Sequence, residues 1–168
     1  MKGFKGFKRF KEFKEFKRFK GFKGFKRFKG FKEFWMAAVR DFEELSVFQK
    51  SRELSARIYS ITQKAGFKTD YRFVQQIRAA AGSIMDNIAE GFERDGNKEF
   101  VNFLYIAKGS CGEVRSQIIR ANDVGYLTKE EYNELYVECR RLSSGIMNFI
   151  KEIKASNITG IKYKTYNP

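Results

Sequence analysis

Apolar residues recur at steps of three and four positions along nearly the whole chain after Phe42, and this spacing constrains the fold most. Such a period places apolar side chains on one face of an α-helix. Only glycines and short polar runs interrupt it, and the one proline is the last residue. The sequence therefore predicts long amphipathic helices that bury their apolar faces against one another.

The pattern divides into four predicted helices, separated by glycines or polar residues that are typical of helix ends. Gly66 is expected to end the first helix as a C′ glycine, and Thr69-Asp70 to cap the second. Thr128 and Glu131 form the expected capping box of the fourth. In chain order, the predicted helices run from Ser46 to Ala65, from Asp70 to Phe92, from after Asn97 to before Gly125, and from Thr128 to Ile153.

Four helices with short connections favour antiparallel neighbours. The sequence thus predicts an all-α protein, an up-down-up-down four-helix bundle over residues 36–154, followed by a tail at 155–168. We expect a cytoplasmic protein, because no segment is apolar enough to span a membrane or to act as a secretory signal, and two cysteines make no disulfide framework.

Residues 1–35 differ from the rest, since they consist of eleven Lys-x-Phe units in which x is Gly, Arg or Glu. A period of three gives neither a helix nor a strand a single apolar face, so we expect this extension to be disordered or a frayed helix. The codons GGA, AGA and GAA differ by single G/A changes, which favours a translated tandem DNA repeat with Met36 as the more natural start. A functional alternative is a basic-aromatic arm for single-stranded nucleic acid or an anionic membrane.

The extension also carries most of the charge. Residues 1–34 hold 11 Lys, 3 Arg and 3 Glu, a net charge of +11, whereas the remainder holds 20 basic and 17 acidic residues. The predicted bundle is therefore nearly balanced. The chain contains no histidine, which argues against a di-iron site, against a Ser or Cys nucleophile with an imidazole base, and against an enzyme generally. No metal or other cofactor is expected.

A polar stripe runs beside the apolar face on the second and third predicted helices. A hairpin turn near residues 93–96 makes opposed positions sum to about 190, which puts Ser83 near Ala107. Glycines 109 and 112 are expected to allow close approach, and a partly buried network of Asn87, Glu90 and Glu113 is expected beside them. We interpret the stripe as a register-fixing layer or a subunit interface, with a ligand site as the alternative. Its residues are Gln76, Ser83, Asn87, Glu90, Ser110 and Glu113.

Two further sets follow from the same helix pairing. Cys111 and Cys139 are expected to lie level on the third and fourth helices as buried, unreactive thiols. A basic patch is the candidate nucleic-acid contact of the body, although a solvated face with salt bridges is the usual explanation of such a set at this net charge. It comprises Arg72, Arg78, Arg115 and Arg120.

The run from Gln75 to Val114, QQIRAAAGSIMDNIAEGFERDGNKEFVNFLYIAKGSCGEV, resembles the four helix bundle family encoded by intervening sequences of bacterial large-subunit ribosomal RNA genes. The shared motifs are Gln-Ile-Arg, Ser-Ile, Asn-Ile-Ala-Glu-Gly, Lys-Glu-Phe, Phe-Leu and Ala-x-Gly-Ser. The segments LSVFQKSRELSARIY and GYLTKEEYNEL extend the resemblance to about 42–153. This chain departs at Met85-Asp86, where the family often has Pro-Ser, and at Ala79, where it has a second Arg.

The resemblance implies a non-enzymatic, ring-shaped homo-oligomer, commonly a pentamer. A related family, the accessory protein of diversity-generating retroelements, has the same bundle and ring and binds a reverse transcriptase and nucleic acid. We therefore expect binding of RNA or a ribonucleoprotein through backbone electrostatics, and no membrane contact. The alternative is an adaptor that docks a protein, such as a reverse transcriptase.

Overall fold

The computed structural model describes residues 39, 41–94 and 96–155 of the 168-residue chain. The Lys-x-Phe extension lies outside the described residues, and so does the predicted tail, apart from Ala155 at the end of the last helix. The expectations for these segments, and the domain boundaries drawn from them, stay predictions.

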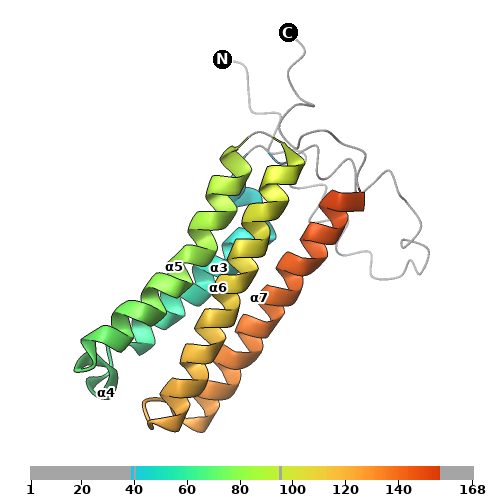
Figure 1. The fold of residues 1–168 in the computed structure, drawn as a ribbon. Helices are drawn as coiled ribbons and strands as arrows, with labels where there is room; N and C mark the ends of the chain where they lie inside the picture. The colour runs from blue at the N-terminus through green and yellow to red at the C-terminus, as the bar shows by residue number, and fades with distance from the viewer. Residues whose placement is uncertain (1–38, 40, 95, 156–168) are drawn as a thin grey trace, which may run out of the picture. The chain divides into compact units, whose positions relative to one another are not determined.

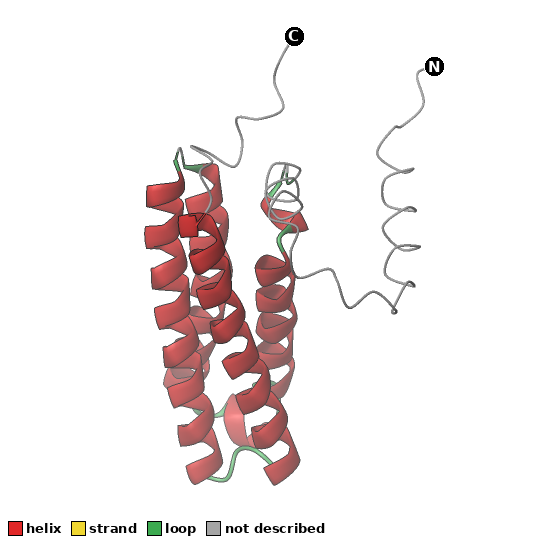
Figure 2. Ribbon diagram, turned by 90° about the vertical axis from the view of Figure 1, so that its right-hand side faces the viewer, coloured by secondary structure: helices red, strands yellow, loops and turns green. Residues whose placement is uncertain are grey.

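The described residues form helices and connecting turns, with no strand among them (Figure 2). Four helices are long, one is a single turn, and a short 3-10 turn precedes them. In chain order they are η2 (Phe42–Glu44), α3 (Ser46–Ile61), α4 (Ala65–Lys68), α5 (Tyr71–Glu93), α6 (Asn97–Asp123) and α7 (Lys129–Ala155).

The long helices α3, α5, α6 and α7 pack side by side as a four-helix bundle (Figure 1). Going round the bundle, α5 contacts α6, α6 contacts α7, and α3 closes the circle by contacting α5 and α7. Short connections make successive long helices antiparallel. The predicted fold class, an all-α up-down-up-down bundle, is confirmed.

One apolar core runs the length of the bundle, as the helical spacing predicts. It takes residues from every long helix, and its deepest side chains are completely shielded from solvent. Among these fully buried side chains are Leu54, Ile58, Phe73, Ile84, Leu104, Ile118, Leu142 and Ile146. Burial of this size is the main stabilising contribution to such a fold.

Side-chain caps set the starts of two helices where the sequence predicts them. The carboxylate of Asp70 accepts a hydrogen bond of 3.0 Å from the backbone N–H of Phe73, at the first turn of α5. At α7 the hydroxyl of Thr128 accepts from the N–H of Glu131 at 3.3 Å, and the Glu131 carboxylate accepts from the N–H of Thr128 at 3.0 Å. This reciprocal pair is the predicted capping box.

The end of the first helix differs from the prediction. Helix α3 ends at Ile61, not at Ala65, and Gly66 lies inside the short helix α4 and has no positive φ. The buried hydroxyl of Thr62 donates to a carbonyl of the last turn, at 2.9 Å from both the Ile58 and Tyr59 oxygens. The chain then turns, and Phe67 of α4 packs fully buried against Phe73 and Tyr126. Helix α4 thereby closes this end of the core.

Candidate functional site

The polar stripe predicted on the second and third helices forms a small cluster between α5 and α6. The hydroxyls of Ser83 and Ser110 lie 3.0 Å apart, and the Asn87 amide donates to the Ser83 carbonyl at 2.7 Å and to its hydroxyl at 3.1 Å. Ser110 is 5% exposed, and Ser83 and Asn87 are half-buried. Because each of these three side chains has a hydrogen-bond partner, the cluster favours one register of the α5–α6 pair.

The other three residues of the stripe lie elsewhere. Gln76, Glu90 and Glu113 are exposed, so the expected network of Asn87 with Glu90 and Glu113 is not the one formed. Glu90 instead accepts from Arg94 at 2.7 Å, and Arg94 also donates to Glu99 of α6 at 3.0 Å. The hydrogen bond to Glu90 is the first cause that keeps the pKa of Arg94 above its usual value.

The register of the hairpin differs from the expected one by about three residues. Ser83 lies opposite Ser110, and not opposite Ala107. The glycine of close approach is Gly91, where an added Cβ would lie 2.5 Å from Cβ of Phe103. Gly109 and Gly112 do not serve close approach, because nothing lies within 4 Å of a Cβ added at either. Both glycines therefore lie away from the contact between α5 and α6, whereas the sequence spacing predicted that they lie in it.

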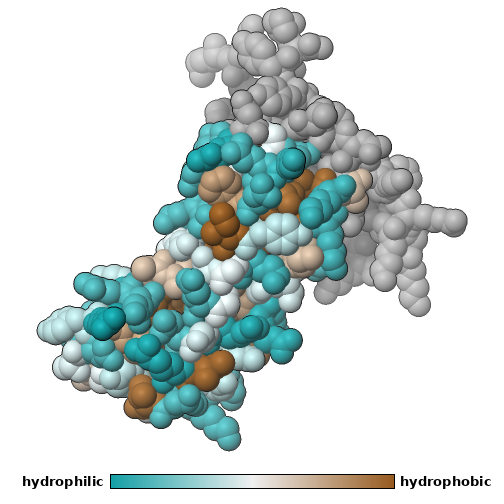
Figure 3. Space-filling model, viewed as in Figure 1, coloured by the Kyte–Doolittle hydropathy of each residue, from teal (hydrophilic) through white to brown (hydrophobic). Residues whose placement is uncertain are grey.

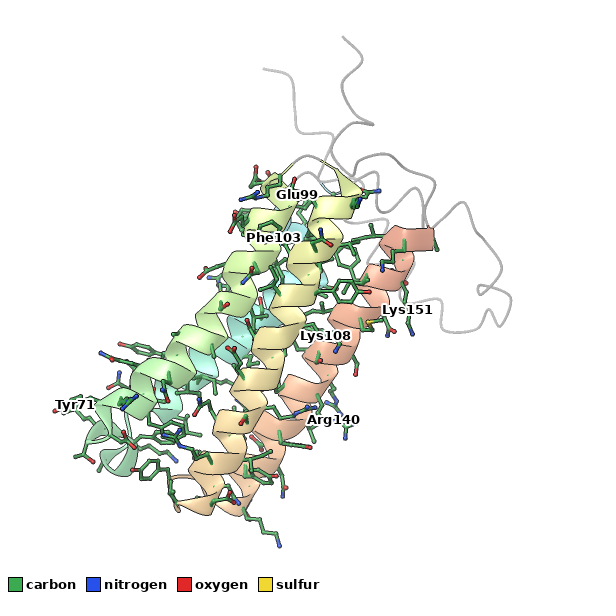
Figure 4. The ribbon with its side chains drawn as sticks, viewed as in Figure 1. Tyr71, Glu99, Phe103, Lys108, Arg140 and Lys151 are labelled. Carbon is green, nitrogen blue, oxygen red and sulfur yellow. The ribbon has the colours of Figure 1, made fainter. Side chains whose placement is uncertain are left out.

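Two of the four predicted arginines lie at the bundle end that is remote from the α5–α6 turn. Arg72 is exposed near the start of α5, and Tyr71 beside it projects from the bundle (Figure 4). Arg120 of α6 is exposed and reaches across to α5, where its guanidinium lies 4.1 Å from the ring centroid of Phe73. This contact is a cation–π interaction, and it holds an exposed guanidinium at this end of the bundle.

The other two arginines lie on opposite sides of the α5–α6 pair. Arg78 points toward α3, donating to the Thr62 hydroxyl at 2.8 Å and covering the Tyr59 ring at 4.3 Å. Arg115 lies on the side of α6 that faces α7, where its charge acts on the thiols of Cys111 and Cys139. The structure therefore brings Arg72 and Arg120 to one end but does not gather all four arginines into a single patch.

The two cysteines lie level on α6 and α7, as the sequence predicts. Cys139 Sγ donates to the Cys111 carbonyl oxygen at 3.0 Å, and both free thiols are 1% exposed. The hydrogen bond between the thiols raises the pKa of Cys111 and lowers that of Cys139. Burial at this level makes both residues core groups with no route for a solvent reagent.

Ion pairs join α3, and the connection that follows it, to the neighbouring side of α7. Arg57 donates to Glu134 at 2.7 Å and to Glu138 at 2.6 Å, and Lys64 pairs with Glu131. The Lys64 hydrogen bond is the first cause that lowers the pKa of Glu131, followed by the capping bond to Thr128. The carboxylates Glu131, Glu134 and Glu138 of α7 are thus paired with basic residues of α3 and of the connection between α3 and α4.

Sequence analysis missed a row of basic side chains on the opposite side of α7. Between residues 139 and 155 this helix has one carboxylate, Glu152, and four basic residues, of which Arg140, Lys151 and Lys154 share the side away from α3 and Arg141 does not. Glu152 lines a shallow groove toward α3 together with Leu45 and Lys50. The excess of basic over acidic residues in this segment could have indicated the row, but the bundle as a whole is nearly neutral, so its net charge did not.

The described residues hold no group of three or more carboxylate or thiol side chains that is arranged to bind a metal ion. No helix in the described part combines the length and apolar character needed to cross a bilayer. In the face drawn in Figure 3, apolar side chains form small separate spots between polar ones. On this face the chain offers charged, hydrogen-bonding and small apolar areas for contact.

These features define the chain as an all-α four-helix bundle with charged outer faces. The model of the 23S rRNA-intervening sequence protein family matches residues 43–148. This match covers more than half of the chain, and the chain belongs to that family.

A solved structure agrees with the fold. It is a protein of unknown function from the S23 ribosomal protein family of Bacteroides thetaiotaomicron, with 24% sequence identity and a TM-score of 0.57. The match covers 62% of this chain and 98% of that chain. A comparison with curated proteins found no match.

Proposed function

We propose that this protein is a non-enzymatic oligomeric bundle that binds RNA, or a ribonucleoprotein, through contacts with the phosphate backbone. One observation carries the proposal: among the described residues, no ion pair involves Arg72, Arg78, Arg115 or Arg120. Arg72 and Arg120 are also exposed, so their guanidinium groups are accessible to phosphate, which arginine binds through two parallel N–H groups. The family's connection with ribosomal RNA genes supports RNA as the ligand.

The proposal is tested by RNA binding at several salt concentrations, for the full chain and for a chain that begins at Met36. Phosphate contacts release counterions, so the logarithm of the affinity falls by about 0.7–0.9 per contact for each tenfold rise in salt. We expect the shorter chain to bind with a steep salt dependence. Binding by the full chain alone would assign the RNA contact to residues 1–35 and leave the bundle without this function.

The second part of the proposal is that the chain assembles into a ring of identical subunits. The family resemblance implies five subunits. Ile106 is 52% exposed on α6, and Gly109 follows it on the same side with open space above its backbone. A glycine in mid-helix costs about 1 kcal/mol relative to alanine, and the fold of one subunit gives no reason for it. A second copy that packs on this side of α6 supplies one.

Light scattering on the full chain and on the chain from Met36 tests assembly. We expect both to have the mass of a closed oligomer at micromolar concentration, because identical subunits close rings through a repeated contact. A monomer in both cases would contradict the assembly proposal without affecting the RNA proposal.

The same open side of α6 favours the second candidate, an adaptor that docks a partner protein such as a reverse transcriptase. Exposed apolar side chains beside a glycine suit a partner helix. Apolar docking depends little on salt, whereas phosphate contact depends strongly on it. The salt titration therefore separates the two candidates.

A further inference from the structure

Helices α6 and α7 carry five basic side chains along the surface where the two helices meet. They are Lys108 and Arg115 on α6, and Arg140, Lys151 and Lys154 on α7; we call them the basic flank. Steps of seven, eleven and three residues keep each set on one side of its helix. In Figure 4, Lys108 lies between α6 and α7, and Arg140 and Lys151 lie along the right-hand edge of α7.

Contacts between the helices fix the direction of this flank. The charges of Lys108 and Arg115 act on the thiol of Cys111, which lies at the interface with α7. At the other end, Lys154 of α7 donates to the Tyr105 hydroxyl of α6 at 3.0 Å. Basic groups from both helices therefore border one shared surface.

Carboxylates are sorted away from this surface. Between residues 100 and 122, helix α6 has one carboxylate, Glu113, which follows the α5-facing Ser110 by three residues and lies toward that side. Helix α7 has only Glu152 after residue 139, and Glu152 lines the groove toward α3. No ion pair among the described residues involves a member of the basic flank.

We propose that the basic flank is the surface on which the chain holds the phosphate backbone of RNA. From Arg140 to Lys154 the helix rises about 21 Å, at roughly 1.5 Å per residue, which spans several successive phosphates. A row of this kind neutralises backbone charge without reading bases. The inference rests on the proposed function and assigns it to one surface. Of the four arginines predicted from the sequence, only Arg115 belongs to this surface.

Acetylation of lysines on the full chain, with and without RNA, tests the location directly. Amine reagents report each lysine separately, so binding by residues 1–35 does not obscure the bundle. A short RNA duplex and its single strand serve as probes. We expect RNA to slow acetylation of Lys108, Lys151 and Lys154 about fivefold or more, because phosphate contact shields the amine. Lys50 on α3 is the internal control and is expected to react at the same rate.

The possible results separate this inference from the function on which it rests. Protection of Lys68, beside Arg72, with the basic flank unchanged would overturn the location and leave RNA binding by the bundle intact. Protection confined to residues 1–35, or to no lysine, would overturn both.

Matched charge variants give a second readout. The triple variant Lys108→Gln, Arg140→Gln and Lys151→Gln removes three charges from the basic flank. Each phosphate contact contributes about 0.7–0.9 to the slope of log affinity against log salt, so the slope of the triple variant should be smaller by about 2–3. Its RNA affinity at moderate salt should fall by roughly ten- to a hundredfold.

The control triple variant removes three exposed charges from other sides: Lys50→Gln, Arg52→Gln and Arg141→Gln. Arg141 follows Glu138 by three residues and so lies toward α3, although it is adjacent to Arg140. We expect the salt slope of the control variant to differ from that of the unchanged chain by no more than the slope of about one phosphate contact. Equal losses in both triple variants, with unchanged melting, would show dependence on total charge and contradict the inference.

Discussion

Replacing Phe67 by alanine is expected to destabilise the protein by about 3–5 kcal/mol, the loss typical of a large aromatic removed from a core. Phe67 is 0% exposed, and its ring centroid lies 5.6 Å from that of Phe73 and 4.8 Å from that of Tyr126. Helix α4 is only one turn long and is held by its connections to α3 and α5, which limits how far it can shift to fill the space. Denaturant unfolding should show the loss, and thermal melting should drop by roughly 10–20 °C.

The matched control is Tyr71→Ala, four residues later and 75% exposed. Removing an exposed ring changes stability by about 0.5 kcal/mol or less. An equally small effect at Phe67 would contradict the role of α4 as the closure of the core.

Replacing Gly91 by alanine is expected to cost about 1–3 kcal/mol through overpacking. The new Cβ would lie 2.5 Å from Cβ of Phe103 and 3.0 Å from Cδ2 of Phe100. The first atom is held by the backbone of α6, so relief requires α5 and α6 to separate near their turn. The Arg94 ion pairs with Glu90 and Glu99 lie at the same end and should loosen with it. Urea unfolding measures the change.

Gly109→Ala is the control for Gly91→Ala, and we expect it to stabilise the fold where Gly91→Ala destabilises it. Nothing lies within 4 Å of its added Cβ, so the gain in helix propensity, about 1 kcal/mol, is retained within one subunit. If Gly109 lies at a contact between copies, the same variant should weaken assembly in light scattering. A stabilised Gly91→Ala variant would show that the close approach of α5 and α6 is not rigid.

Local rules predicted the helices and their starts well. Asp70 and Thr128 cap helices because their side chains bond to backbone groups only three residues away, a relation contained in the sequence itself. The end of α3 was missed because Ala65 continues the apolar spacing. What ends the helix is tertiary: the burial of Thr62 and of Phe67 at the end of the bundle.

The candidate site was predicted less completely, because helix pairing depends on rotation and register. A three-residue shift brings Ser83 to Ser110 and leaves Glu113 exposed. Glycine spacing could not tell which glycines face a neighbouring helix, so Gly91 was missed as the contact point. Likewise, the basic flank becomes visible only when α6 and α7 are set side by side, since its members come from two separate segments of a nearly neutral bundle.

The sorting of charge around α7 gives the bundle an electric dipole directed across its long axis. The carboxylates of α7 toward α3 are paired with Arg57 and Lys64, so that side is close to balanced, whereas the basic flank carries positive charge with no ion pair among the described residues. In the field of a polyanion such a molecule experiences a torque as well as a pull, so it turns its basic side forward before contact. Salt screens this orienting field together with the net attraction, so the association rate should fall as the ionic strength rises.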